Sequence, residues 1–260
     1  MGEGWYRTTV LLGTALLRGL GVTVRAEGQH HVPAEGPVVL AANHVSFPDF
    51  VFIGRALLDS PRRIRFMCRH EIWESPLRRP MEGMRHVAVD RRAPAAAYLA
   101  ARRLLGEEEI VCVFPEGGIS AAYTVRALMP GAAALARETG APIVPVTIWG
   151  SQVLWPQRRA LGERFPRPTL RRGALVDVRF HEPMTVSEDA DLTATTRDLG
   201  RRLWTGLEEL QRLPEHRPRP GERLRTYPAH LGGNAVPREE SFALDRMPRS
   251  AVRPTWGPLS

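Results

Sequence analysis

The stretch PVVLAANHVSFPDFVFIGRALL, residues 37–58, contains an apolar run, a short polar segment and a second apolar run, in that order. The first run, residues 37–43, is short and almost entirely apolar, which is typical of a strand buried on both faces of a sheet. The second run, residues 48–58, opens on Pro48 and predicts a helix. A buried strand followed directly by a helix indicates an α/β fold.

The same alternation continues along the chain. Residues 75–83 form a loop-rich interruption, and Pro145, inside an apolar run, suggests an edge strand or a bulge because it lacks a ladder donor. The sequence therefore predicts a single α/β domain over residues 22–213, with a central mixed β-sheet flanked by helices. Its further strands are predicted at 22–28, 63–69, 86–90, 109–114, 142–150 and 173–183, and its further helices at 94–107, 130–140 and 191–213.

Residues 1–21 predict an amphipathic helix. Arg7 and Arg18 lie on one side, and a broad opposite face carries Trp5, Tyr6, Val10, Leu12, Leu16, Leu17 and Leu20. Such a helix either lies in a lipid interface or packs on the domain as its first helix, and the pattern leaves both readings open. We expect neither a signal peptide nor a transmembrane helix, since no cleavage site follows an apolar core and no run reaches about 18 apolar residues.

The composition indicates an anionic partner. The net charge is +8 and the pI is about 10.7, and all 36 basic side chains are Arg, which binds phosphate with a planar fork. The Arg residues are spread along the chain without a nucleic-acid-binding motif, so we expect no nucleic-acid partner. Residues 214–260 are rich in Pro, Arg and Gly and are predicted to form an extended or partly disordered tail.

Cys68 and Cys112 lie in two apolar runs that are predicted to be strands. Their positions have no metal-ligand spacing, and nothing in the sequence indicates an oxidising compartment. We interpret both as buried, reduced thiols, and we expect neither a metal site nor a cofactor.

The polar segment NHVSFPD, residues 43–49, carries the strongest candidate for catalysis. His44 follows the predicted strand, and Asp49 lies in the first helical turn, where the helix dipole favours a carboxylate. A carboxylate there reaches back to one ring nitrogen of His44 and makes the other nitrogen a better base for a substrate hydroxyl. The spacing alone equally fits a loop His followed by a helix Asp, so the pair needs its context.

Two further stretches follow predicted strands, at the sheet edge where open α/β sheets bind ligands. In FPEGG, residues 114–118, Glu116 can accept hydrogen bonds from substrate hydroxyls, and Gly117 lets a ligand approach the backbone closely. Arg91 and Arg92 are placed to clamp a phosphate by charge-assisted hydrogen bonds. The alternatives are an ordinary glycine turn and solvated surface arginines.

Taken together, these stretches resemble the glycerolipid acyltransferase family. Four of its blocks match in order: H-x-x-x-x-D at 44–49, a block ending in Arg after an apolar run at 83–91, FPEG at 114–117 and V-P-V at 144–146. Each block alone is a modest signal, but four in the family's order and at plausible spacing are a strong one. The resemblance covers about residues 11–180.

The resemblance implies direct acyl transfer without a covalent acyl-enzyme. His44 would be the general base, Asp49 would orient it, and the acceptor would be bound by Arg91, Glu116 and Gly117. The donor would be acyl-CoA or acyl carrier protein, and the acceptor a lysophospholipid, with 1-acyl-glycerol-3-phosphate giving phosphatidic acid. The resemblance also favours an interfacial N-terminal helix, and hence a peripheral or monotopic enzyme on an anionic membrane surface, at the cytoplasmic face of the cell membrane.

Two positions depart from the family's pattern. Ile119 stands where the FPEG block usually continues with an Arg, and Met129 stands where a Lys often precedes the next helix. Arg126 is close in the sequence and is a candidate replacement. These departures leave open the same chemistry on a different lipid acceptor. Outside the enzymes, the alternative is a basic protein that binds membrane or nucleic acid without catalysis.

Overall fold

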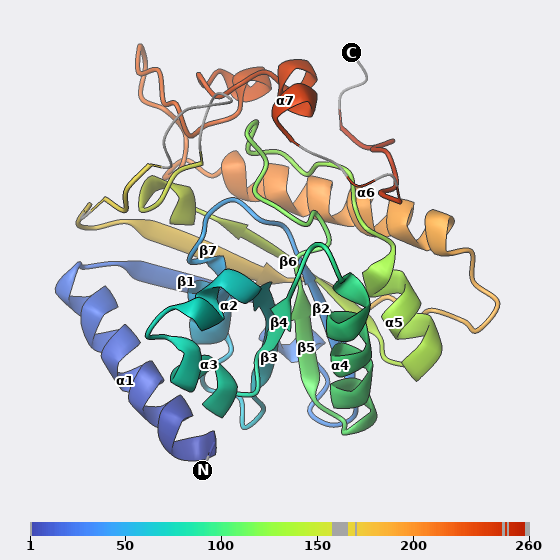
Figure 1. Ribbon diagram of the computed structural model, residues 1–260. Helices are drawn as coiled ribbons and strands as arrows, with labels where there is room; N and C mark the ends of the chain where they lie inside the picture. The colour runs from blue at the N-terminus through green and yellow to red at the C-terminus, as the bar shows by residue number, and fades with distance from the viewer. Residues whose placement is uncertain (1, 158–165, 170, 246–247, 249, 258–260) are drawn as a thin grey trace.

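The computed structural model describes residues 2–157, 166–169, 171–245, 248 and 250–257 (Figure 1). At its centre is a seven-stranded sheet with the strand order β1-β7-β6-β2-β5-β3-β4. The five strands from β6 to β4 run parallel, β7 pairs antiparallel with β6, and β1 pairs parallel with β7, so the sheet is mixed, as predicted. The strands are β1 (Thr23–Glu27), β2 (Val38–Ala42), β3 (Ile64–Arg69), β4 (Val87–Val89), β5 (Ile110–Val113), β6 (Ile143–Trp149) and β7 (Leu175–Phe180).

The predicted helices and strands of the domain are all present, with ends shifted by a few residues. The stretch 75–83 was expected to be loop-rich, which is wrong for its second half, because a short helix forms there. The α-helices of the described residues are α1 (Gly2–Gly19), α2 (Asp49–Ala56), α3 (Arg78–Gly83), α4 (Pro94–Gly106), α5 (Gly131–Thr139), α6 (Leu192–Gln211) and α7 (Arg238–Leu244). Short 3-10 helices lie at Gln29–His31, His70–Glu74, Ser151–Val153 and Ala229–Leu231.

The order of the parallel strands decides which helices cover which face, because crossover connections are right-handed. The chain passes from β2 to β3 through α2 and on to β4 through α3, so these two helices share a face. It returns from β4 to β5 through α4 and from β5 to β6 through α5, which places α4 and α5 on the opposite face (Figure 1). α6 packs beside α5 and on β6, and α1 packs beside α2 and α3.

The central strands form the core. All residues of β2, β5 and β6 are buried, which explains their continuous apolar sequence, and each aliphatic side chain buried there contributes about 1.5–3 kcal/mol. Pro145 lies in β6, an interior strand, so the expectation of an edge strand is wrong. The alternative of a bulge fits instead, because Ile143 pairs with Met184 and Val146 with Phe180, so that the partner chain has one extra residue beside Pro145, whose carbonyl accepts from the N–H of His181 at 2.9 Å.

The N-terminal helix docks on the domain but keeps apolar side chains in solvent. Leu17 packs against the core, whereas Leu11, Leu12 and Leu16 are 68%, 68% and 62% exposed. The side chains of Trp5, Tyr6 and Arg7 lie outside those that the structure describes. No helix among the described residues is long and apolar enough to cross a membrane.

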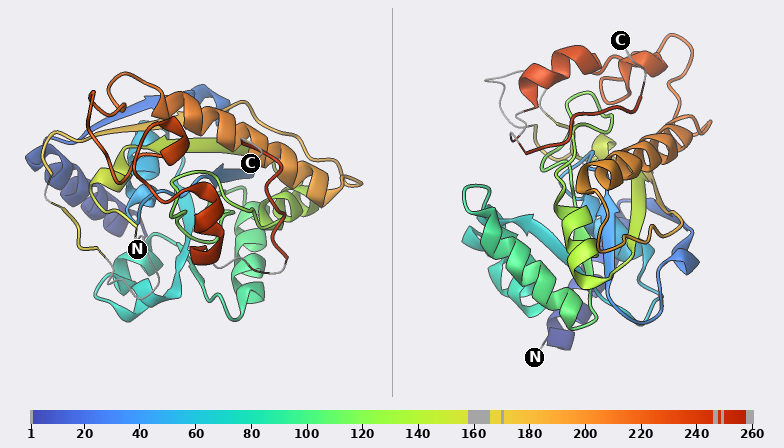
Figure 2. Two further views of the ribbon diagram at one scale, coloured as in Figure 1. Left: turned by 90° about the horizontal axis from the view of Figure 1, so that it is seen from above. Right: turned by 90° about the vertical axis from the view of Figure 1, so that its right-hand side faces the viewer.

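The C-terminal segment, residues 214–257, corrects a prediction. We expected an extended or partly disordered tail, but its described residues include α7 and bury Tyr227, Val252 and Trp256. The Trp256 ring packs on α6 at Gly200. Figure 2 shows the segment as a layer at the end of the molecule opposite the N-terminus. The composition of this segment suggested disorder because the side chains that it buries are few and widely spaced, and they lack the periodicity that indicates a regular element.

This packing predicts the effect of two glycine substitutions. A Cβ at Gly200 would lie 2.4 Å from the Trp256 ring, whereas a Cβ at Gly106, the last residue of α4, would meet nothing within 4 Å. Gly200→Ala should lower the free energy of unfolding by about 1–3 kcal/mol through overpacking. Gly106→Ala should raise it by up to about 1 kcal/mol through helix propensity. Urea denaturation measures both, and a stabilising Gly200→Ala would show that Trp256 does not pack there.

Candidate active site

The site lies between the carboxyl ends of β2 and β5. These strands are neighbours, but the helix after β2 covers one face and the helix after β5 covers the other, so the two chains diverge as they leave the sheet. Such a switch point is where open α/β sheets bind ligands. Within the sheet, Ala41 of β2 pairs with Val113 of β5. Three residues after each of them, beyond the ends of the strands, the main-chain N–H of His44 donates to Glu116 Oε1 at 2.7 Å.

Asp49 is completely buried in the first turn of α2 and directs one oxygen at the His44 loop. Its Oδ2 accepts from His44 Nδ1 at 2.8 Å and from the main-chain N–H groups of Val45 and Ser46 at 2.8 and 2.9 Å. Its Oδ1 accepts from Ser151 Oγ at 2.5 Å. Four donors therefore hold one carboxylate, and that carboxylate fixes the orientation of the His44 ring.

The His44 ring is oriented but still reachable. Its side chain is 18% exposed, and it stacks on Phe114 with ring centroids 4.4 Å apart. Because the bond to Asp49 assigns the proton to Nδ1, Nε2 is left with its lone pair. The predicted pair thus has the geometry of a general base with its orienting carboxylate.

The preceding residue, Asn43, fixes the end of β2. It is fully buried, and its side chain donates to the carbonyl of Ile148 at 3.1 Å and accepts from the N–H of Ile148 at 2.7 Å. The amide therefore continues the pairing of β2 with β6 past the end of the ladder. This bond anchors the main chain immediately before His44.

Glu116 accepts hydrogen bonds from two segments of backbone, at His44 and at Arg126. It is 1% exposed, and its second oxygen accepts from the main-chain N–H of Arg126 at 3.0 Å. Burial raises the pKa of Glu116 to about 8, against the opposing effect of the two N–H groups and the Arg126 charge. In this arrangement both carboxyl oxygens are taken by the protein itself, and its predicted contact with the acceptor stays a prediction.

A group of arginines lies beyond the neighbouring strands. Arg91 follows β4 and Arg69 ends β3, and both side chains are exposed. Partial desolvation and the positive charges of Arg69 and Arg126 lower the pKa of Arg91, while Glu71 opposes the shift. The charges of Arg69 and Arg126 therefore both act on Arg91, and this concentration of positive charge favours an anion such as a phosphate.

Gly117 and the two departures from the family pattern, Ile119 and Met129, also have definite positions. Gly117 is exposed and has a φ of 63°, a conformation that favours glycine. Ile119 is 4% exposed and so lies in the interior rather than at a phosphate site. Met129 is partly buried and donates its main-chain N–H to Pro115 at 2.7 Å.

Sequence reasoning missed Arg69 and Ser151. Arg69 is the last residue of a predicted strand, so the rule that ligands bind at the carboxyl ends of strands could have singled it out. Ser151 lies 102 residues from Asp49 in the sequence, and only the fold brings its hydroxyl to that carboxylate.

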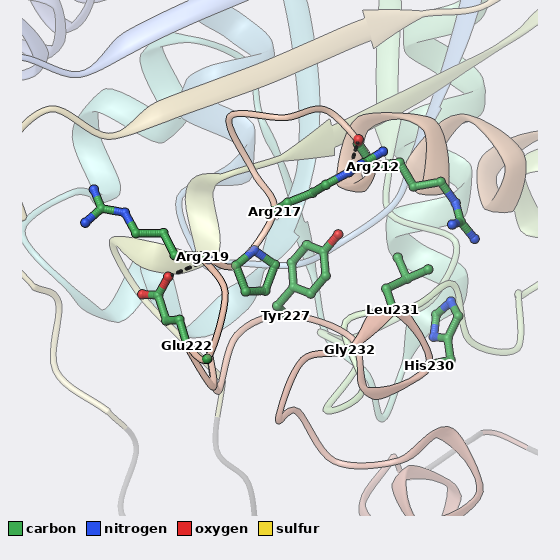
Figure 3. A pocket seen from close by; sticks show the side chains of 10 residues that line it. Arg212, Arg217, Arg219, Glu222, Tyr227, His230, Leu231 and Gly232 are labelled. Atoms are coloured by element: carbon green, nitrogen blue, oxygen red, sulfur yellow. Dashed lines mark hydrogen bonds between the residues drawn. The ribbon is translucent and has the colours of Figure 1, made fainter.

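A separate pocket of 510 Å³ lies between the end of α6 and the C-terminal segment (Figure 3). Arg212, Arg217, Arg219 and Tyr227 line it, and Arg217 Nε donates to the carbonyl of Arg212 at 2.6 Å. None of the predicted site residues borders this pocket. Cys68 and Cys112 are buried free thiols, as predicted. Among the described residues no group of three or more His, Cys, Asp or Glu side chains could hold a metal ion.

Residues 23–149, which contain His44, Asp49, Arg91 and Glu116, match the family model described as Acyltransferase. They form an acyltransferase-family domain. A crystal structure of the 1-acyl-sn-glycerophosphate (LPA) acyltransferase of Thermotoga maritima has the same fold as this acyltransferase domain and its surroundings. The two chains align with a TM-score of 0.63 and 23% identity over 79% of each.

Two curated relatives of this chain are named for the same activity. A 1-acyl-sn-glycerol-3-phosphate acyltransferase of Chlamydomonas reinhardtii is 29% identical over 163 residues, which are 61% of this chain and 46% of that protein. A protein of the same name from Bacillus subtilis (strain 168) is 27% identical over 129 residues, 49% of this chain and 63% of that protein. The matched part of the chain thus spans about half to two thirds of the length of these relatives.

Glu116 leads to a prediction about pH. Because its pKa is raised to about 8, the folded state holds a proton that the unfolded chain loses near its ordinary pKa. The stability from this group is present below about pH 4 and is lost as the pH rises through about 8. Glu116→Gln does not titrate, so its free energy of unfolding, measured in urea from about pH 5 to 9, should decline less than that of the wild type. Equal declines would contradict the raised pKa.

Proposed function

We propose that this chain transfers an acyl group from a thioester donor to the hydroxyl of a lysophospholipid, with 1-acyl-glycerol-3-phosphate as acceptor and phosphatidic acid as product. The observation that carries the proposal is the bond from His44 Nδ1 to the buried carboxylate of Asp49, at the switch point of an acyltransferase-family domain. The names of the relatives support the choice of acceptor.

In the proposed reaction His44 Nε2 removes the proton of the acceptor hydroxyl as its oxygen attacks the thioester carbonyl carbon. Asp49 stabilises the imidazolium that forms. Collapse of the tetrahedral intermediate breaks the C–S bond and leaves an ester on the acceptor. The thiolate of coenzyme A or of the carrier protein takes the proton from Nε2, which returns His44 to its starting state without a covalent acyl-enzyme.

The acceptor phosphate is proposed to lie against Arg69 and Arg91. Both guanidinium groups are exposed at the same sheet edge as His44, and Arg forms paired, charge-assisted hydrogen bonds with phosphate. Arg126, the candidate replacement for the family's missing cation, is only 7% exposed and so contributes its charge from behind the surface. Glu116 and Gly117 complete the proposed acceptor side of the site.

The chain is also proposed to work on an anionic membrane surface, at the cytoplasmic face of the cell membrane. The exposed leucines of α1 lie on the helix that packs beside α3, and Leu77, next to α3, is 56% exposed. A helix with apolar side chains in solvent on a chain of net charge +8 suits an anionic lipid interface. This arrangement would bring the domain to acceptors that reside in the bilayer.

Substitution of His44 tests the proposed general base. His44→Ala should lower kcat by about 10²- to 10⁴-fold, because the general base is lost. His30→Ala, an exposed histidine in a 3-10 helix, is the matched control and should keep full activity. Product formation is measured by mass spectrometry with acyl-CoA or acyl carrier protein as donor, and with lysophosphatidic acid, other lysophospholipids or a lysoglycolipid as acceptor. Product from another acceptor but none from lysophosphatidic acid would reject the proposed substrate, and full activity of His44→Ala would reject the general base.

The exposed leucines predict membrane binding. Leu12→Ser/Leu16→Ser should reduce binding to phosphatidylglycerol-containing vesicles at least about tenfold, since each leucine gains roughly 1.5–3 kcal/mol when it leaves water completely. Leu99→Ser, on the exposed side of α4, is the control and should bind like the wild type. Vesicle flotation measures the bound fraction. Equal binding by the double variant would place the lipid contact elsewhere.

A further inference from the structure

The C-terminal segment is bonded to the loop that follows the FPEG turn, residues 117–129, here called the 117–129 loop. Leu128 and Val252 exchange main-chain hydrogen bonds of 3.2 and 2.8 Å. The Trp256 indole N–H donates to the carbonyl of Val125 at 3.1 Å. In Figures 1 and 2 this loop lies directly beneath the segment. The segment therefore covers a loop that belongs to the proposed active site.

One of these contacts joins two buried charges. The Arg126 guanidinium lies 3.3 Å from Asp245 Oδ1, and the two side chains are 7% and 4% exposed. The same oxygen accepts from the main-chain N–H of Ala121 at 3.3 Å. Asp245 directly follows α7, so its carboxylate reaches the loop from the C-terminal segment.

Arg126 is close to the reacting groups through its own backbone. Its main-chain N–H donates to Glu116 Oε2 at 3.0 Å, while Glu116 Oε1 accepts from the main-chain N–H of His44 at 2.7 Å. A continuous series of contacts thus runs from Asp245 through Arg126 and Glu116 to the backbone of the general base. Functional groups depend on such supporting contacts, because shifts of about 0.5 Å already disturb productive geometry.

The counter-charge also helps to hold the Arg126 guanidinium in its buried position. Removing one charge of a buried ion pair is costly, so loss of the Asp245 charge should disturb the Arg126 side chain and the 117–129 loop around it. The charge of Arg126 already reaches Arg91, whose pKa it lowers. In this arrangement Arg126 is buried together with Asp245, whereas Arg69 and Arg91 are exposed.

We propose that Asp245 is a positioning residue for acyl transfer, which acts through Arg126 on Glu116 and on the backbone of His44. The C-terminal segment, which lies outside the matched acyltransferase domain, is thereby a working part of the active site. This inference rests on the function proposed above. It assigns the segment a role in catalysis beyond covering the core.

The test compares Asp245→Asn, Arg126→Met and the double variant with the wild type, using lysophosphatidic acid and acyl-CoA. Asp245→Asn keeps the shape of the side chain and removes its charge. Its kcat/KM for the acceptor should fall at least about tenfold, because small displacements of reacting groups are costly, while the KM for the donor stays within about twofold. Glu240→Gln removes an exposed charge from α7 and should behave like the wild type.

The double variant distinguishes a route through Arg126 from an independent effect. If Asp245 acts through Arg126, the double variant should be no less active than Arg126→Met alone. Effects that multiply would overturn the proposal, and so would wild-type kinetics of a folded Asp245→Asn. Equal rises in the KM of acceptor and donor, together with a lowered Tm, would indicate a merely structural role and would also overturn it.

Two further outcomes are decisive. If Asp245→Asn does not fold, Arg126→Met/Asp245→Leu takes its place, because replacing a whole buried ion pair by apolar side chains is tolerated far better than removing one partner. Wild-type kinetics of that variant would overturn the proposal. If the wild type itself acylates no acceptor, the proposed function fails, and that failure is distinguishable because it appears before any variant is compared.

Discussion

Strand β2 pairs in parallel with β5 on one side and with β6 on the other, and the geometry of the site depends on this central position. The helices after β2 and β5 leave towards opposite faces, so a polar residue that follows either strand enters the crevice between them. Because both strands are completely buried, a shift in register would expose apolar side chains. The register that forms the core therefore also sets His44 beside Glu116.

Two buried carboxyl groups hold different parts of His44, its ring and its main chain. Asp49 accepts a hydrogen bond from the ring and determines which nitrogen keeps a lone pair. Glu116 accepts a hydrogen bond from the main chain and determines where the loop itself lies. The environments of the two groups also differ. Four hydrogen-bond donors contact the Asp49 carboxylate, whereas Glu116 accepts two hydrogen bonds and its burial raises its pKa to about 8. Side-chain orientation and backbone position are thus held by separate groups.

The C-terminal segment gives the departure at Ile119 a structural meaning. Ile119 lies in the 117–129 loop, on which this segment packs, and its side chain is only 4% exposed, so an apolar residue suits the position. The cation of this region is instead Arg126, which is buried together with Asp245 from the segment. Where the family pattern has an Arg after the FPEG turn, this chain has an interior Ile119, and its nearby cations are the buried Arg126 and the exposed Arg69 and Arg91.

The sequence by itself determined the alternation of strands and helices, because burial on both faces leaves continuous apolar runs that local patterns reveal. It also singled out His44, Arg91 and Glu116, since each follows a predicted strand, and Asp49, since it lies in the first turn of the helix after His44. Only the tertiary structure decided that Ser151 reaches Asp49, that Glu116 joins His44 to Arg126, and that Asp245 reaches Arg126. Those contacts join residues 10 to more than 100 positions apart, and strand order and a segment without periodicity bring them together, neither of which a local pattern encodes.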